Sequence, residues 1–181
     1  MFARRNTYQR FFLAAIVPLL MNTFMVFCLE AADKFVDFSL EDLNETKHSQ
    51  TDLKDKISLV VLQSRTTLQT AIDCKAELKK LLTENQRTQL IAIMDLRKKP
   101  ALAPKFAVKS KISSQDTTSK EIPFLLDWDG KVTEALGGKD DICNILVVDP
   151  ELNVVYKQEY KKAVIDSEIR PLLVKLSKGQ R

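Results

Sequence analysis

The chain has 181 residues, and its 28 lysines and arginines against 24 aspartates and glutamates give a formal net charge of +4. This length suits one domain of ordinary size plus an appendage. Residues 1–32 hold three of the basic residues and one of the acidic ones, so the rest of the chain is nearly balanced. No basic stripe interleaved with aromatic residues remains, which argues against a nucleic-acid partner.

The N-terminus has the pattern of a targeting segment. Residues 1–10 contain three arginines and no acid, and residues 11–29 carry no charge at all. A basic start followed by an apolar stretch is typical of a secretory signal peptide or an N-terminal membrane anchor. The length of this stretch lies between that of a signal-peptide core, about 7–15 residues, and that of a membrane-spanning helix, about 20 residues, so both alternatives stay open. We therefore expect residues 1–32 to direct export, residues 11–29 to lie in the membrane if uncleaved, and residues 33–181 to form the domain.

Cysteine and histidine are too sparse for a metal site. Outside the targeting segment the only cysteines are Cys74 and Cys143, with no C-x-x-C, and His48 is the only histidine. This set offers too few ligands for zinc and no local Cys–His pair. We expect no metal and no cofactor.

The first half of the domain predicts a strand–helix–strand unit. Alternating residues at 35–40 predict a short strand, and the polar residues 41–56 predict a loop. Residues 57–62 form a buried-strand run, and the helix that follows is expected to begin at Thr66 or Thr67 as its N-cap. Residues 88–96 return as a near-continuous apolar strand, which is typical of a parallel strand buried on both faces. Such a unit implies a right-handed crossover.

The pattern breaks between residues 97 and 120. Two prolines, several lysines and a serine- and threonine-rich run predict a long loop there, with room for a short helix at about 105–110. A loop of this length inside a domain is either functional or a tolerated surface insertion.

The last third predicts a strand, a short helix, a hairpin and a final helix. A buried run at 122–126 leads into the turn 127–130, where Asp127 and Asp129 are better explained as turn residues than as a paired-carboxylate site. A short helix at 132–136, a hairpin over 142–156 and an amphipathic helix around 169–176 follow. The whole order predicts an α/β domain, a mixed central sheet with helices on both faces. That is the order of the thioredoxin-like fold.

Two stretches carry a resemblance to a known family. Residues 122–132 show the pattern P-x-x-x-D-x-x-G, and residues 144–149 form a strand that ends in aspartate. The chain thus resembles the redoxin branch of the thioredoxin-like superfamily, and most closely the YtfJ-like exported proteins of the bacterial cell envelope, which lack the C-x-x-C. The resemblance implies a periplasmic protein, or one anchored in the inner membrane and facing the periplasm.

The resemblance also shows where the chain departs from active redoxins. At the helix start, where the dipole and free amides would lower a thiol pKa, the chain has Thr67 and Thr70 instead of cysteines. Hydroxyl groups cannot form a disulfide, so this position is expected to be redox-inactive. Cys143 aligns near the usual cis-proline. Cys74 would then lie about 10 Å along the helix, too far from Cys143 for a disulfide.

These departures favour a binding protein. We expect a redox-inactive domain that binds a protein or peptide in the former substrate groove, together with residues 97–120. The candidate groove residues are Arg65, Thr66, Thr67, Thr70, Cys143 and Asn144. The alternative is a thiol-dependent peroxidase or oxidoreductase that uses Cys143 or Cys74. A third possibility is a structural envelope protein without a groove-centred partner.

Overall fold

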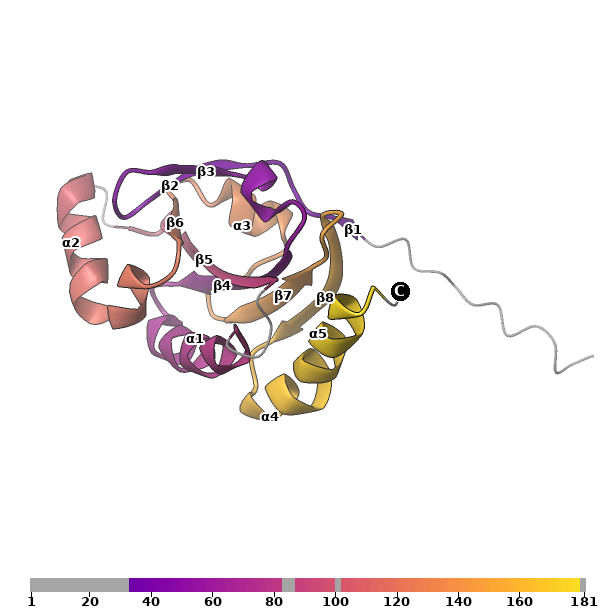
Figure 1. The fold of residues 1–181 in the computed structure, drawn as a ribbon. Coiled ribbons are helices and arrows are strands. Elements are labelled where there is room, and N and C mark those ends of the chain that lie inside the picture. The colour runs from indigo at the N-terminus through magenta and orange to yellow at the C-terminus, as the bar shows by residue number, and fades with distance from the viewer. Residues whose placement is uncertain (1–32, 83–86, 100–101, 180–181) are drawn as a thin grey trace, which may run out of the picture. The chain divides into compact units, whose positions relative to one another are not determined.

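A mixed sheet of eight strands, in the order β1-β8-β7-β4-β5-β6-β2-β3, occupies the centre of the part of the chain described (Figure 1). This computed structural model describes residues 33–82, 87–99 and 102–179. The expected targeting segment, residues 1–32, lies outside them. Within the described residues, no helix combines the length and apolar character needed to cross a membrane.

The strand–helix–strand unit has the predicted form. The central strands are β4 (Ile57–Ser64), β5 (Thr88–Asp95), β6 (Phe124–Asp127), β7 (Asn144–Val148) and β8 (Asn153–Glu159). β4, β5 and β6 are parallel, and β7 and β8 form the antiparallel hairpin. Every residue of β4 is buried, as expected for a strand covered on both faces.

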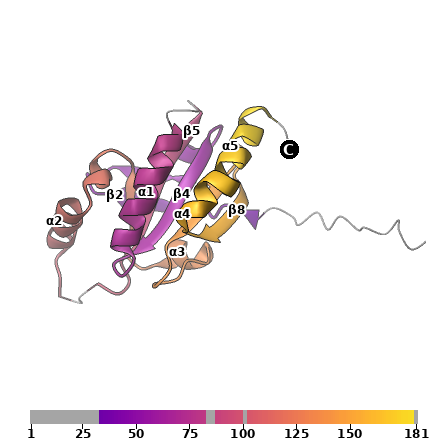
Figure 2. The same ribbon diagram turned by 90° about the horizontal axis from the view of Figure 1, so that it is seen from below.

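Helices cover both faces of the sheet, which confirms the mixed α/β prediction. One face carries α1 (Leu68–Leu82) beside a C-terminal helical stretch, as Figure 2 shows. That stretch consists of α4 (Lys162–Val164), the π-helical segment Ile165–Ile169 and α5 (Arg170–Ser177). The other face carries α3 (Lys131–Ala135) and the 3-10 turn Gln50–Leu53 (Figure 1). Side chains at alternate positions of β4 therefore enter two separate cores.

The segment before β4 differs from its prediction. Residues 35–40 do not form one strand, since β1 (Asp33–Lys34) and β2 (Ser39–Asp42) flank an irregular stretch. Phe35 and Phe38 in that stretch are buried against each other, with ring centroids 6.0 Å apart in an edge-to-face arrangement. Burial of both rings therefore sets the path of the chain there.

The loop predicted for residues 41–56 is also wrong, because β2 continues into a hairpin with β3 (Lys47–Ser49). The Asp42 carboxylate closes this hairpin by accepting from the amides of Asn44 and Thr46, at 2.8 and 2.9 Å. β2 then pairs with β6, so the hairpin extends the sheet.

Residues 97–120 are mostly helical, which corrects the prediction of a long loop. The helix expected at about 105–110 continues as α2 (Lys105–Gln115), followed by the 3-10 turn Thr117–Lys120. Ile112 is the only residue of α2 that is buried. With so weak an apolar stripe, this helix was hard to recognise from sequence.

Candidate functional site

The turn before α1 is closed by its own hydroxyl groups. Thr67 immediately precedes α1, and its carbonyl accepts the first helical hydrogen bond from the Ala71 amide at 2.9 Å. Its hydroxyl accepts from the Ser64 amide at 2.9 Å. Thr67 thus has the predicted N-cap position, but its hydroxyl stabilises the preceding turn instead of capping first-turn amides.

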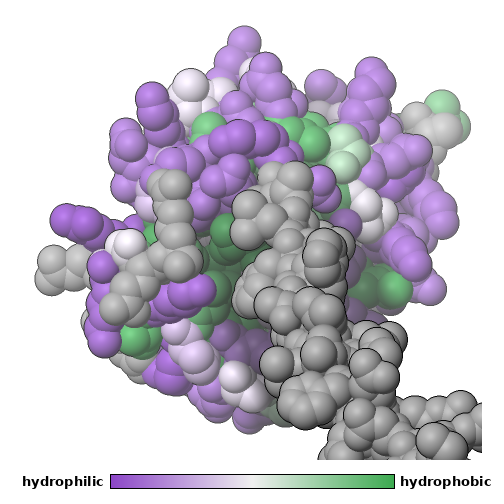
Figure 3. Space-filling model, turned by 90° about the vertical axis from the view of Figure 1, so that its right-hand side faces the viewer, coloured by the Kyte–Doolittle hydropathy of each residue, from purple (hydrophilic) through white to green (hydrophobic). Residues whose placement is uncertain are grey.

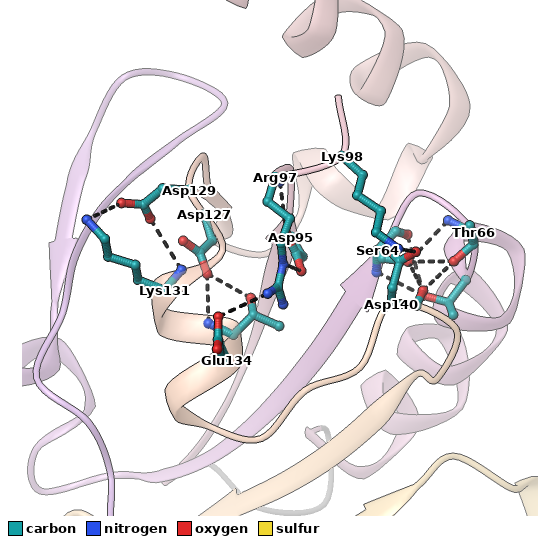
Figure 4. Close-up of polar contacts among 12 residues, drawn as sticks. Ser64, Thr66, Asp95, Arg97, Lys98, Asp127, Asp129, Lys131, Glu134 and Asp140 are labelled. Atoms are coloured by element: carbon teal, nitrogen blue, oxygen red, sulfur yellow. Dashed lines mark hydrogen bonds and ion pairs between the residues drawn. The ribbon is translucent and has the colours of Figure 1, made fainter. Parts of the chain in front are cut away.

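The loop before β7 is fastened to this turn. The hydroxyls of Ser64 and Thr66 both donate to the carbonyl of Asp140, and the Lys98 ammonium lies 2.8 Å from the Asp140 carboxylate (Figure 4). Beyond this loop, Cys143 and Asn144 are both buried. The side of the expected groove near Asn144 is therefore closed.

Both thiols lie in the core under α1. Cys74 and Cys143 belong to one buried apolar cluster, and both are free. Burial raises the pKa of the Cys74 thiol well above its usual value, and the hydrogen-bonded Cys143 thiol raises it further. The second turn of α1 packs over the start of β7, so the expectation that the two residues lie far apart is wrong. A buried thiol with a raised pKa is a poor nucleophile.

Polar residues end three neighbouring strands at one edge of the sheet. Ser64, Asp95 and Asp127 lie in register on β4, β5 and β6. The Asp95 carboxylate accepts from the Arg97 Nε at 2.7 Å, and Arg97 also reaches Glu134 of α3 at 3.1 Å (Figure 4). These ion pairs fix the chain leaving β5 against α3.

Asp127 stabilises the start of α3. It is fully buried, and its Oδ2 accepts from the amide and the hydroxyl of Thr133 at 2.7 and 2.8 Å. Burial raises the pKa of Asp127, although the Thr133 bonds oppose that shift. Asp129 pairs with Lys131 at 2.7 Å. Gly130, between Asp129 and Lys131, has a left-handed conformation with φ 73°. A Cβ there would lie 2.5 Å from the Arg97 Nε. Both aspartates therefore serve the turn.

A groove lies between the start of α1, the end of β5 and α2. Its volume is about 360 Å³. We call it the α2 groove. The lining residues are Arg65, Leu68, Met94, Leu96, Lys99, Ala103, Ala107, Val108, Lys111, Ile112 and Gln115. Most of the wall is apolar, and every charge on it is positive.

A buried ion pair holds α2 in place. Lys75 of α1 contacts the carboxylate of Asp116, which directly follows α2, and both side chains are fully buried. Burial lowers the pKa of Lys75, and Asp116 opposes that shift. The Lys75 ammonium also lies 4.7 Å from the centre of the Phe124 ring, and the Thr118 amide donates to Asp116 at 3.0 Å. The wall of the groove thus depends on one charged contact inside the core.

Gln63 is the polar exception beneath α1. It lies on the α1 face of β4, in register with Met94 of the groove, and is 1% exposed. Among the described residues, neither atom of its amide has a hydrogen-bond partner. An unsatisfied buried amide is costly, so Gln63→Leu is expected to raise the free energy of unfolding by about 1–2 kcal/mol.

Urea unfolding measures this effect, with Gln89→Leu as the matched control. The Gln89 amide donates to Ser58 Oγ at 2.8 Å and to the Asp52 carbonyl at 3.1 Å. Its replacement is expected to destabilise the domain by about 1 kcal/mol. A loss of stability in Gln63→Leu would show that its amide is satisfied.

The comparisons with solved structures all point to one fold. A putative thiol:disulfide interchange protein DsbE from Chlorobium tepidum matches with a TM-score of 0.63 at 15% identity, over 80% of this chain and 96% of that one. A putative protein disulfide isomerase from Bacteroides thetaiotaomicron gives 0.61 at 14%, over 81% and 89%. The exposed lipoprotein thioredoxin Etrx1 of Streptococcus pneumoniae gives 0.59 at 16%, over 75% and 99%. This domain has a thioredoxin-like fold. Neither a protein-family model nor a curated protein sequence matches the chain.

The thioredoxin-like domain separates the candidate residues into two groups. Arg65, Thr66 and Thr70 are exposed, and Arg65 lines the α2 groove. Thr67, Cys143 and Asn144 are buried, while Thr66 binds the loop before β7. The sequence placed residues 97–120 at the groove, but it did not show that α2 continues to Gln115 and forms one wall. The apolar residues at 103, 107, 108 and 112 were the available signal, at helical spacing.

Proposed function

We propose that this protein is a redox-inactive thioredoxin-like protein that binds a peptide or protein segment in the α2 groove. One observation carries the proposal: an apolar groove opens beside the start of α1, while both thiols are buried in the core. The arginine-rich start and the uncharged residues 11–29 support export, and the resemblance to YtfJ-like proteins supports a place in the bacterial cell envelope.

The chemistry of the groove supports binding over catalysis. No cysteine, histidine, carboxylate or hydroxyl side chain is among its lining residues within the described chain. A reaction would need a nucleophile, or an acid or base that titrates near neutral pH. A concave apolar wall with a few charges at its margin is what ligand sites usually offer.

The apolar surface beside the groove supports a polypeptide partner. Leu102, which precedes α2, and Phe106, in the first turn of α2, adjoin the lining residues Ala103 and Ala107 in sequence and are 98% and 75% exposed. Large apolar side chains grouped on a surface commonly mark interaction sites. The far end of the domain, seen in Figure 3, is mostly hydrophilic over the surface that is not covered in grey.

Filling the groove tests the proposal. Immobilised wild-type protein is expected to capture one or more envelope proteins, identified by mass spectrometry, and Ala107→Trp is expected to lose them because the indole occupies the groove. Ala76→Trp, the same change on an exposed part of α1, is the control and should capture normally. Equal capture by both variants would contradict groove binding.

A further inference from the structure

We infer that the α2 groove selects an acidic segment, in which an apolar side chain enters the groove and neighbouring carboxylates meet its positive margin. This inference rests on the proposed function and specifies the partner's chemistry. It starts from the charges at the groove: Arg65, Lys99 and Lys111 come from three different segments, and no acidic residue is among the lining residues of the described chain. Their convergence makes a positive margin around an apolar floor.

The positive residues that line the groove differ from neighbouring lysines in that they form no ion pair within the described part of the chain. Lys98 pairs with Asp140 at 2.8 Å and Lys109 with Glu45 at 3.2 Å, so both are neutralised within the domain. Within the described residues, no ion pair forms at Arg65, Lys99 or Lys111, although the Lys99 ammonium lies 5.9 Å from the centre of the Trp128 ring. The domain thus leaves positive charge at the groove and compensates it on either side.

Arg65 is placed to hold a carboxylate. Its Nη1 donates to the carbonyl of Lys98 at 3.3 Å, which fixes the guanidinium while other donors of its planar fork remain. A guanidinium held in this way suits two-point binding of a carboxylate. Lys111, exposed one turn before Gln115 on α2, supplies a second positive charge across the groove.

The size and surroundings of the groove favour a peptide over a free fatty acid. A volume of about 360 Å³ is at the lower end of ligand sites, enough for one or two apolar side chains. Leu102 and Phe106 are exposed and are not among the lining residues, so they add apolar surface outside the groove. A segment of several residues covers both.

Three labelled hexapeptides test the inference. Their binding to the full-length protein is measured by fluorescence anisotropy. EDLFDE supplies acids around an apolar pair, SNLFNS is its neutral counterpart and KRLFRK its basic one. EDLFDE is expected to bind about five- to tenfold more tightly than SNLFNS, with KRLFRK weakest, because partly exposed charge contacts contribute modestly each. The advantage of EDLFDE should shrink as salt is raised from low ionic strength.

Matched charge reversals complete the test. Lys111→Glu is expected to remove most of the preference for EDLFDE, whereas Lys175→Glu, the same change at an exposed position of α5, should leave it intact. Both substitutions are at exposed positions, and thermal unfolding checks that both variants fold. Equal binding of the acidic and neutral peptides, or an unchanged preference in Lys111→Glu, would overturn the inference. Ala107→Trp capture would still report on the proposed function separately.

A competition experiment with a small molecule tests whether the groove prefers a fatty acid to an acidic peptide. Decanoate carries the same charge on an apolar chain and is titrated against each labelled peptide. Saturable decanoate binding in the absence of any EDLFDE binding would overturn the peptide inference. Binding of EDLFDE that decanoate displaces only weakly supports it.

Discussion

Replacing Asp116 with alanine is expected to lower the free energy of unfolding by about 3–5 kcal/mol, measured by urea denaturation. The change leaves the Lys75 ammonium fully buried beneath α2 without its carboxylate partner. It also removes the acceptor for the Thr118 amide. A loss below about 1 kcal/mol would contradict the view that this pair anchors the segment after α2.

Two further variants separate the charge from the packing. The double variant Lys75→Met, Asp116→Leu removes both charges and is expected to recover most of the stability, because well-packed apolar residues often replace a buried ion pair without loss. The exposed pair Lys80–Glu77, 2.8 Å apart on the same α1, is the control. Lys80→Ala should change stability by less than about 1 kcal/mol.

Both thiols of the reduced native protein are expected to react with iodoacetamide at least about a thousandfold more slowly than in urea. Cys74 and Cys143 are 0% and 3% exposed, so a reagent reaches them only when the core opens. Burial also raises the pKa of Cys74, which lowers its thiolate fraction at neutral pH.

Mass spectrometry of timed samples at pH 7 measures this difference. The same preparation labelled in urea, where both cysteines should react, is the control. Rapid labelling of either native cysteine, together with peroxide consumption or insulin reduction that its alanine variant abolishes, would favour the thiol-dependent enzyme instead.

The central fold could be predicted because its signals are local. The apolar runs that become β4 and β5, with an amphipathic helix between them, leave little choice of topology. The turn Asp127–Gly130 was also recognisable, since aspartates before a glycine that needs a positive φ are a local signature.

The missed elements depend on contacts distant in sequence. β2 and β3 are polar because they lie at the margin of the sheet, and only the hairpin geometry around Asp42 and the pairing with β6 identify them. α2 has one buried residue and is held by Lys75 from a helix some forty positions earlier. No window of sequence shows that partner.

The site was predicted only in part, because some of its contacts also join residues distant in sequence. Position in the strand–helix–strand unit indicated that Arg65 lies near a groove, and it does line one. The contact between the thiols of Cys74 and Cys143 depends on how far α1 is shifted along the sheet, which residue spacing alone does not determine. Whether the candidate groove residues bind a partner stays a prediction.

The sparse anchoring of α2 has a consequence for how large an occupant the domain can accept. Its only buried side chain is that of Ile112, which joins a small apolar cluster with residues of β5 and β6, while two larger clusters pack the rest of the sheet. Segments with few buried contacts open at a small cost relative to global unfolding. Ile112 and the Lys75–Asp116 contact both lie toward the C-terminal end of α2, so we expect its first turns, which line the groove, to open at a lower cost than the rest of the domain.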